Sequence, residues 1–112
     1  MTYKRNLTIE QGTNFEMIVE VTDDDDNPID YTGFDSVAQI RKNIESVNAI
    51  SFNTSIDINN ITVSLDANAT VNAIPGKYIY DIIVRDPENP DLVEKIIEGI
   101  VLINPTVSQW PE

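Results

Sequence analysis

The acidic run Asp23-Asp24-Asp25-Asp26-Asn27, followed by Asp30, is the one cluster whose residue types could hold a metal ion. Calcium takes about six to eight oxygen ligands, and carboxylates and amides on one loop can supply several of them. The run lacks the spaced glycine and the distal glutamate of an EF-hand loop. Asp, Asn and Pro also favour turns, because their side chains bond or restrain the nearby backbone. The pattern therefore favours a solvated turn over residues 23–28 and leaves a structural calcium site as a hypothesis.

Catalytic chemistry finds little support in the 112 residues, which contain no histidine and no cysteine. Their absence removes the commonest general base, the commonest metal ligand and every thiol nucleophile. The nineteen acidic residues show no spacing that selects a pair for glycoside hydrolysis. There is no G-x-S-x-G elbow and no glycine-rich phosphate loop. We therefore expect no enzymatic activity, no catalytic residue and no cofactor.

The only tryptophan, Trp110, is the most conspicuous candidate for a contact residue. It lies between Gln109 and Pro111 in a tail too short to form its own core. Such a tryptophan either folds back onto the domain or docks on another subunit, and the sequence leaves both open. We take these three residues, together with Tyr3, as the candidate partner interface.

The formal charge of −12 restricts the classes of partner. A protein that neutralises phosphates needs clustered Lys and Arg, whereas seven basic residues are scattered here among nineteen acidic ones. We therefore expect no nucleic acid, and no anionic membrane surface for the same reason. No stretch approaches the roughly 20 apolar residues that span a bilayer, and no apolar signal core follows Met1. We expect a domain that is not exported by a cleaved signal and that contacts other proteins.

The longest predicted element is a β-hairpin from Gly76 to Ile103. Alternation with a period of two places four residues on one face of its first arm: Tyr78, Tyr80, Ile82 and Val84. Because they share this face with Ile82 and Val84, we expect both tyrosines to pack in or beside the core rather than to stack on a sugar. The turn is expected at residues 86–91. Gly99 lacks a side chain inside the second arm, which predicts a bulge or the close approach of an aromatic from a neighbouring strand.

Shorter strands are predicted over the rest of the chain, with Ala38 and Ile40 pointing inward. They lie at residues 7–9, 14–22, 37–41, 49–52, 55–58 and 61–65. The alanine-rich segment 66–73 predicts at most one helical turn, which Asp66 could cap. Short strands separated by turn residues, without a βαβ unit, predict an all-β fold: one antiparallel β-sandwich of about seven strands. We assign residues 1–103 to this domain and residues 104–112 to a C-terminal tail.

Several segments, in this order, resemble a known group of proteins. They are Leu7-Thr8-Ile9-Glu10-Gln11-Gly12, Asn27-Pro28-Ile29-Asp30-Tyr31-Thr32-Gly33, Ala38-Gln39-Ile40-Arg41, Gly76-Lys77-Tyr78-Ile79-Tyr80-Asp81, Glu98-Gly99-Ile100-Val101 and Pro105-Thr106-Val107-Ser108. Together they are similar to the small immunoglobulin-like β-sandwich structural proteins of tailed bacteriophage virions. The N-terminal domain of phage upper baseplate proteins is one example.

The resemblance implies a non-enzymatic structural or assembly module. Such a protein is made in the host cytoplasm and is located in the virion, on the baseplate, tail, neck or head surface. Its partners would be other virion structural proteins, and it would form a homo-oligomer or ring within the particle. The resemblance carries no catalytic or cofactor-binding residue.

The alternative is a carbohydrate- or host-receptor-binding β domain. Its stacking platforms would come from Tyr3, Tyr31, Tyr78, Tyr80 or Trp110. Two or more exposed coplanar rings beside carboxylates would favour this function. Buried tyrosines, with termini that contact other subunits, would favour assembly.

Overall fold

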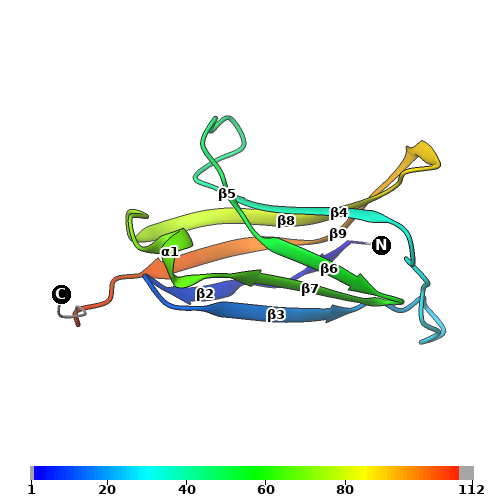
Figure 1. Ribbon diagram of the computed structural model, residues 1–112, viewed down its shortest axis with the longest axis horizontal. Helices are drawn as coiled ribbons and strands as arrows, with labels where there is room; N and C mark the ends of the chain where they lie inside the picture. Colours follow the sequence, from blue (N-terminus) through cyan, green and yellow to red (C-terminus); the bar gives the residue numbers. More distant parts are fainter. Residues whose placement is uncertain (1, 109–112) are drawn as a thin grey trace.

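The computed structural model describes residues 2–108, which form a sandwich of two β-sheets (Figure 1). The larger sheet has the order β1-β9-β8-β4-β5, with β2 also paired to β9. Its strands are β1 Tyr3–Lys4, β2 Leu7–Glu10, β4 Asp35–Arg41, β5 Ile50–Ser51, β8 Gly76–Asp86 and β9 Asn89–Asn104. The smaller sheet has the order β3-β7-β6. Its strands are β3 Phe15–Glu20, β6 Asn53–Asp57 and β7 Asn60–Leu65, and the short helix α1, Ala67–Thr70, follows β7.

The predicted β-sandwich is confirmed, and its strands fall into seven continuous runs within the described residues. β1 and β2 pair with β9 in one register, Tyr3 opposite Ile97 and Leu7 opposite Val101, so they are halves of one strand. β5 and β6 are likewise separated only by Phe52, where the chain passes from one sheet to the other. The prediction that all strands pair antiparallel was wrong in one place, because β1 and β2 run parallel to β9. The intervening domain serves as the long connection that a parallel pair requires.

The predicted hairpin is confirmed as β8 and β9, but its turn is shorter than residues 86–91. Pro87 and Glu88 alone connect the strands, because Asp86 already pairs with Asn89. The Asp86 carboxylate accepts a hydrogen bond from the Glu88 N–H at 2.9 Å. Residues 90–92 then bulge out of the ladder, where a proline at position 90 removes no ladder hydrogen bond.

A second irregularity of β9 places two consecutive isoleucines in the core. Ile82 pairs with Ile97 and Ile83 with Lys95, so Ile96 is an extra residue. A bulge interrupts the alternation of faces, and both Ile96 and Ile97 are buried. The sequence predicted either a bulge or the close approach of an aromatic at Gly99. The bulge lies three positions earlier, at Ile96.

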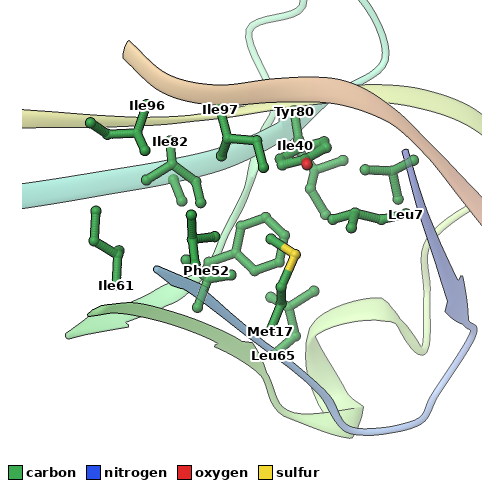
Figure 2. Packing of buried hydrophobic residues seen from close by; sticks show 14 of the residues in the cluster. Leu7, Met17, Ile40, Phe52, Ile61, Leu65, Tyr80, Ile82, Ile96 and Ile97 are labelled. Carbon is green, nitrogen blue, oxygen red and sulfur yellow. The ribbon is translucent and has the colours of Figure 1, made fainter. Parts of the chain in front are cut away.

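The core lies between the sheets and consists mainly of aliphatic side chains, with three buried aromatic residues among them: Tyr31, Phe52 and Tyr80. Figure 2 shows Phe52 between Ile40 and Ile82 of the larger sheet and Met17 and Leu65 of the smaller one. Ala38 and Ile40 point inward as predicted, each 1% exposed. The rings of Phe52 and Tyr80 meet edge to face, with their centroids 6.4 Å apart. Close packing of such residues is the main source of the domain's stability.

The predicted helical turn is confirmed as α1, although the side chain of Asp66 does not cap it. The Ala67 N–H instead donates to the Asn14 side-chain oxygen at 2.8 Å, so the cap comes from the segment before β3. Thr70 is fully buried, and its hydroxyl oxygen accepts a hydrogen bond from the Gly12 N–H at 3.0 Å. These two bonds fix α1 against the turn between β2 and β3.

Gly99 is required by the backbone of the N-terminal strand. A Cβ at this position would lie 2.1 Å from the Arg5 carbonyl oxygen. The approaching group is thus a backbone carbonyl and not the aromatic that the sequence predicted. The aromatic Tyr80 is nevertheless involved: it pairs with Gly99, and its hydroxyl donates to the same carbonyl at 2.6 Å. Burial raises the pKa of Tyr80 to about 12.

We predict that Gly99→Ala destabilises the domain by about 3 kcal/mol, because the new methyl group must displace backbone. Urea unfolding measures the change. Leu102→Ala is the control on the same strand: Leu102 is 46% exposed, and its truncation should cost about 1 kcal/mol or less. Equal losses in the two variants would contradict the contact.

The pKa of Tyr80 also predicts an alkaline loss of stability. An unfolded tyrosine titrates near about 10, whereas folded Tyr80 titrates at about 12, so the native state favours the protonated hydroxyl. This contribution is complete below the unfolded pKa and is lost as the pH rises through the folded one, by up to about 1.4 kcal/mol per pH unit. Tyr80→Phe should make the decline in unfolding free energy between about pH 10 and 12 shallower. Parallel declines in the variant and the parent would argue against this assignment.

Candidate functional site

The predicted partner interface is only partly described. Trp110, Gln109 and Pro111 lie outside the described residues. Tyr3 lies in β1, where it is partly buried and packs against the core. Its hydroxyl donates to the Thr22 carbonyl at 3.0 Å, which ties β1 to the loop after β3. Tyr3 is therefore held within the domain by its hydroxyl group and by packing against the core.

A small depression of about 230 Å³ lies beside Tyr3 and is also lined by Tyr31 and Glu94. Tyr31 is 2% exposed, and its hydroxyl donates to a Glu94 carboxylate oxygen at 2.9 Å. Burial raises the pKa of Tyr31, and the hydrogen bond and negative charge of Glu94 raise it further. Both tyrosine hydroxyls that reach this depression are thus already engaged within the domain.

The acidic run uses its first carboxylate to build a turn. Asp23 accepts hydrogen bonds from the Asp25 and Asn27 N–H groups at 2.8 and 3.0 Å through the same oxygen. Asp26 takes a positive φ of 63°, which short polar residues tolerate. Within residues 2–108, no group of three or more carboxylates converges in a way that could hold a metal ion. The calcium hypothesis thus gains no support from this geometry.

One end of the sandwich, the acidic end, carries most of the charge. The loop after β3 and the tip of the β8–β9 hairpin both lie at the right of Figure 1. This end holds twelve of the nineteen acidic residues: Glu20, Asp23, Asp24, Asp25, Asp26, Asp30, Asp35, Asp57, Asp86, Glu88, Asp91 and Glu94. It holds one of the seven basic residues, Arg85. Arg85 lies 3.8 Å from Asp35, but both side chains are more than half exposed, so this pair contributes little.

The opposite end, the neutral end, consists of residues 11–14, 42–49, 66–77 and 104–108. Its two acidic and two basic side chains balance: Glu45, Asp66, Lys42 and Lys77. Five apolar side chains are at least half exposed there: Ile44, Val47, Val71, Ile74 and Val107. Two of these, Val47 and Ile74, line a depression of about 530 Å³ together with Tyr78. The Lys42 ammonium lies 4.7 Å from the centre of the Tyr78 ring and covers one of its faces.

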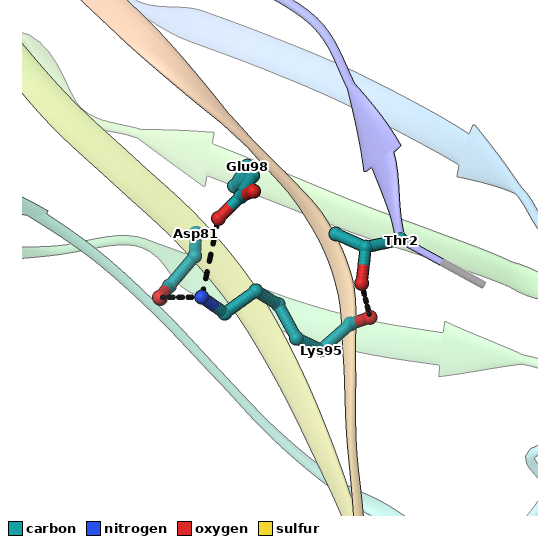
Figure 3. A network of polar contacts seen from close by, with 4 residues as sticks. All are labelled: Thr2, Asp81, Lys95 and Glu98. Carbon is teal, nitrogen blue, oxygen red and sulfur yellow. Dashed lines mark hydrogen bonds and ion pairs between the residues drawn. The ribbon is translucent and has the colours of Figure 1, made fainter.

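The outer face of the larger sheet carries charged side chains that pair with one another. Lys95 lies 3.9 Å from an Asp81 carboxylate oxygen and 3.1 Å from one of Glu98, as Figure 3 shows. The Thr2 hydroxyl donates to the Lys95 carbonyl at 3.1 Å and holds the start of the chain on β9. These charged side chains line a shallow depression of about 590 Å³, but they are well exposed and balance one another locally. The face therefore offers no concentrated charge to a ligand.

The sequence did not single out the neutral end or the gathering of acidic residues. Val47 and Ile74 are isolated apolar residues in polar segments, a pattern that does not identify a surface by itself. The acidic end could have been predicted from the sequence if the strand order were known. β3 and β8 run in the same direction, so the loops that follow them lie at the same end of the sandwich. That inference needs the strand order, which residue patterns do not supply.

The matching family model decides the family. A model for the LtfC-like β-sandwich domain matches residues 2–104. The chain belongs to this family. The LtfC-like family is phage-associated, which confirms the resemblance to phage β-sandwich domains at this coarser level. A search of curated proteins finds no match. The one helix among the described residues, α1, is far too short to cross a membrane.

The calcium hypothesis gives a direct prediction. We expect the melting temperature to stay within about 1 °C when calcium is added after chelation, since no linked binding stabilises the native state. A calcium-dependent rise of several degrees would contradict this expectation. Asp23→Asn with Asp25→Asn is the matched variant, because amide oxygens retain the turn while two charges are removed. Loss of the rise in that variant would place the ion in this loop.

Proposed function

We propose that this LtfC-like domain is a non-enzymatic structural or assembly module of a tailed bacteriophage virion. It acts through protein–protein contacts on the baseplate, tail, neck or head surface. Its partners are other virion structural proteins, including further copies of itself in an oligomer or ring. It uses no nucleic acid, membrane or cofactor for this task. The phage association of the family supports the setting.

The separation of the acidic end from the neutral end is the observation that carries this proposal. A surface with a large excess of carboxylates is attracted to a basic surface and repelled by its own copies. Exposed apolar side chains, in contrast, gain free energy when another surface covers them. The two ends lie at opposite extremes of a molecule 47 Å long. A module that joins two different neighbours needs two such dissimilar surfaces.

The tyrosines give less support to carbohydrate binding. Tyr31 and Tyr80 are buried, and the hydroxyls of Tyr3 and Tyr78 donate to backbone carbonyls. Within residues 2–108, no two tyrosine rings form an exposed platform. We therefore expect no ligand on a glycan array, and a strong glycan signal from a monomer would favour the alternative function.

Image reconstruction of purified particles tests the setting, and three substitutions at the acidic end test the contact. Asp24→Asn, Asp25→Asn and Asp26→Asn together remove three charges without touching the turn-forming Asp23 carboxylate. Because charge complementarity steers and orients association, we expect incorporation into particles to fall about tenfold or more. Mass spectrometry of the particles measures the loss.

The matched control removes three charges that lie outside both ends: Glu10→Gln, Asp81→Asn and Glu98→Gln. It should incorporate like the parent chain, and thermal unfolding should show both variants folded. Equal incorporation of the two variants would contradict a role for the acidic end. Absence of the parent chain from particles would overturn the proposed function as a whole.

A further inference from the structure

The two sides of the sandwich are closed to different extents. On one side, β5 and β6 carry the chain across from the larger sheet to the smaller one. The Ser36 hydroxyl donates to the Thr54 hydroxyl oxygen at 2.8 Å, and the Phe52 N–H to the Ala38 carbonyl at 2.9 Å. The Tyr31 N–H also bonds to the Ile58 carbonyl at 2.8 Å. Hydrogen bonds therefore close this side along most of its length.

On the other side, β3 is the last strand of the smaller sheet, and within residues 2–108 the edge that faces away from β7 has no partner strand. The Val21 N–H donates to the Asn59 carbonyl at 2.8 Å, and β3 continues this register with β7. Alternation in an antiparallel pair then directs the N–H and C=O groups of Glu16, Ile18 and Glu20 away from β7. Within residues 2–108, no strand pairs with that edge. We call these three residues the open edge.

The open edge borders a groove with room for side chains. The groove holds about 380 Å³ between β2 and β3 and is lined by Arg5, Leu7, Thr8 and Met17, among others. A strand placed beside β3 would direct every second side chain into it and the others onto the outer face of the sheet. The edge thus offers both backbone partners and side-chain space.

The charges on the open edge decide between occupants. In an antiparallel contact between two copies of β3 centred on Ile18, each Glu16 would face a Glu20 of the other copy. Like charges directly opposite are destabilising. All three side chains are exposed on the outer face, with Ile18 at 56%. A strand that carries basic residues beside the two glutamates and an apolar residue beside Ile18 complements them instead.

We propose that an extended segment of another protein, with basic residues at alternate outward positions, adds to the open edge as a fourth strand of the smaller sheet. Backbone hydrogen bonds supply affinity in this mode, and alternate side chains supply specificity. That the segment belongs to another virion protein rests on the proposed function; the edge contact itself does not.

Hydrogen exchange with a synthetic peptide tests the edge directly. The probe is a peptide of about eight residues with lysine at every fourth position and valine elsewhere. It is long enough to span β3, and it can place two lysines beside the glutamates and a valine beside Ile18. We expect it to slow exchange of the Glu16, Ile18 and Glu20 amides, and to leave the amides on the side of β6 that faces away from β7 unchanged. The same peptide with glutamate in place of lysine should bind at least about tenfold more weakly, a factor of ten being about 1.4 kcal/mol.

Two variants separate edge pairing from general attraction of a cation to an acidic protein. Glu16→Lys with Glu20→Lys should reverse the preference between the two peptides without altering the backbone. Ile18→Pro removes one outward N–H, which edge strands tolerate, and should weaken binding about tenfold. If that variant does not fold, the charge reversal alone decides.

Protection confined to the acidic end, or an unchanged preference after charge reversal, would overturn the proposal. So would concentration-dependent protection of the open edge without any peptide, because that outcome would make a second copy the occupant. The test needs no particles. Failure here, with the chain present in virions, would remove the edge contact and leave the proposed function intact.

Discussion

The contact between the Arg5 carbonyl and Gly99 places the N-terminal strand in the larger sheet. Because Gly99 has no side chain, the N-terminal segment can lie directly on β9. The Tyr80 hydroxyl and the Ile100 N–H, bonded to Arg5 and Asn6 respectively, hold it there. β1 and β2 on either side of this point both pair with β9. The N-terminal strand therefore extends the larger sheet, and within residues 2–108 β3 pairs only with β7, which leaves the open edge.

The β8–β9 hairpin determines how far apart the two ends lie. β8 begins with Gly76 at the neutral end and finishes with Asp86 at the acidic end. A strand of this length is a stiff spacer when its neighbours on both sides pair with it, as β4 and β9 do. The bulge at Ile96 adds to this stiffness by anchoring two adjacent side chains in the core. The two ends therefore act as separate surfaces on one rigid body.

Sequence patterns predicted the strands well where alternation was strict. Tyr80, Ile82 and Val84 are buried on one face of β8, as a period of two required. Alternation could not predict the bulge, because Ile96-Ile97 reads equally well as a continuous apolar run. Nor could it predict what lies against Gly99, since a missing side chain indicates crowding without naming the neighbour. The cap of α1 was missed for a similar reason: Asn14 is distant in sequence and adjacent only after β3 and β7 have paired.

The candidate surfaces were harder to predict than the fold, because each is formed by segments far apart in sequence. The sequence named Tyr3 as a candidate contact residue, yet its contact with Thr22 depends on β1 lying beside β9. The open edge depends on strand order, and residues 15–20 look like any amphipathic strand. Exclusions from composition needed no such knowledge, since a chain without histidine or cysteine lacks those side chains in any fold.

Turn formation does not account for the carboxylates at the acidic end. Of those residues, Asp23, Asp30 and Asp86 accept backbone hydrogen bonds that shape turns. At the neutral end, the Asn14 and Asn43 amide oxygens accept equivalent bonds without any charge. The same fold therefore builds its turns with or without carboxylates. Mutual repulsion of the remaining acidic residues opposes folding slightly, so their concentration at one end is better explained by what they contact than by what they hold together.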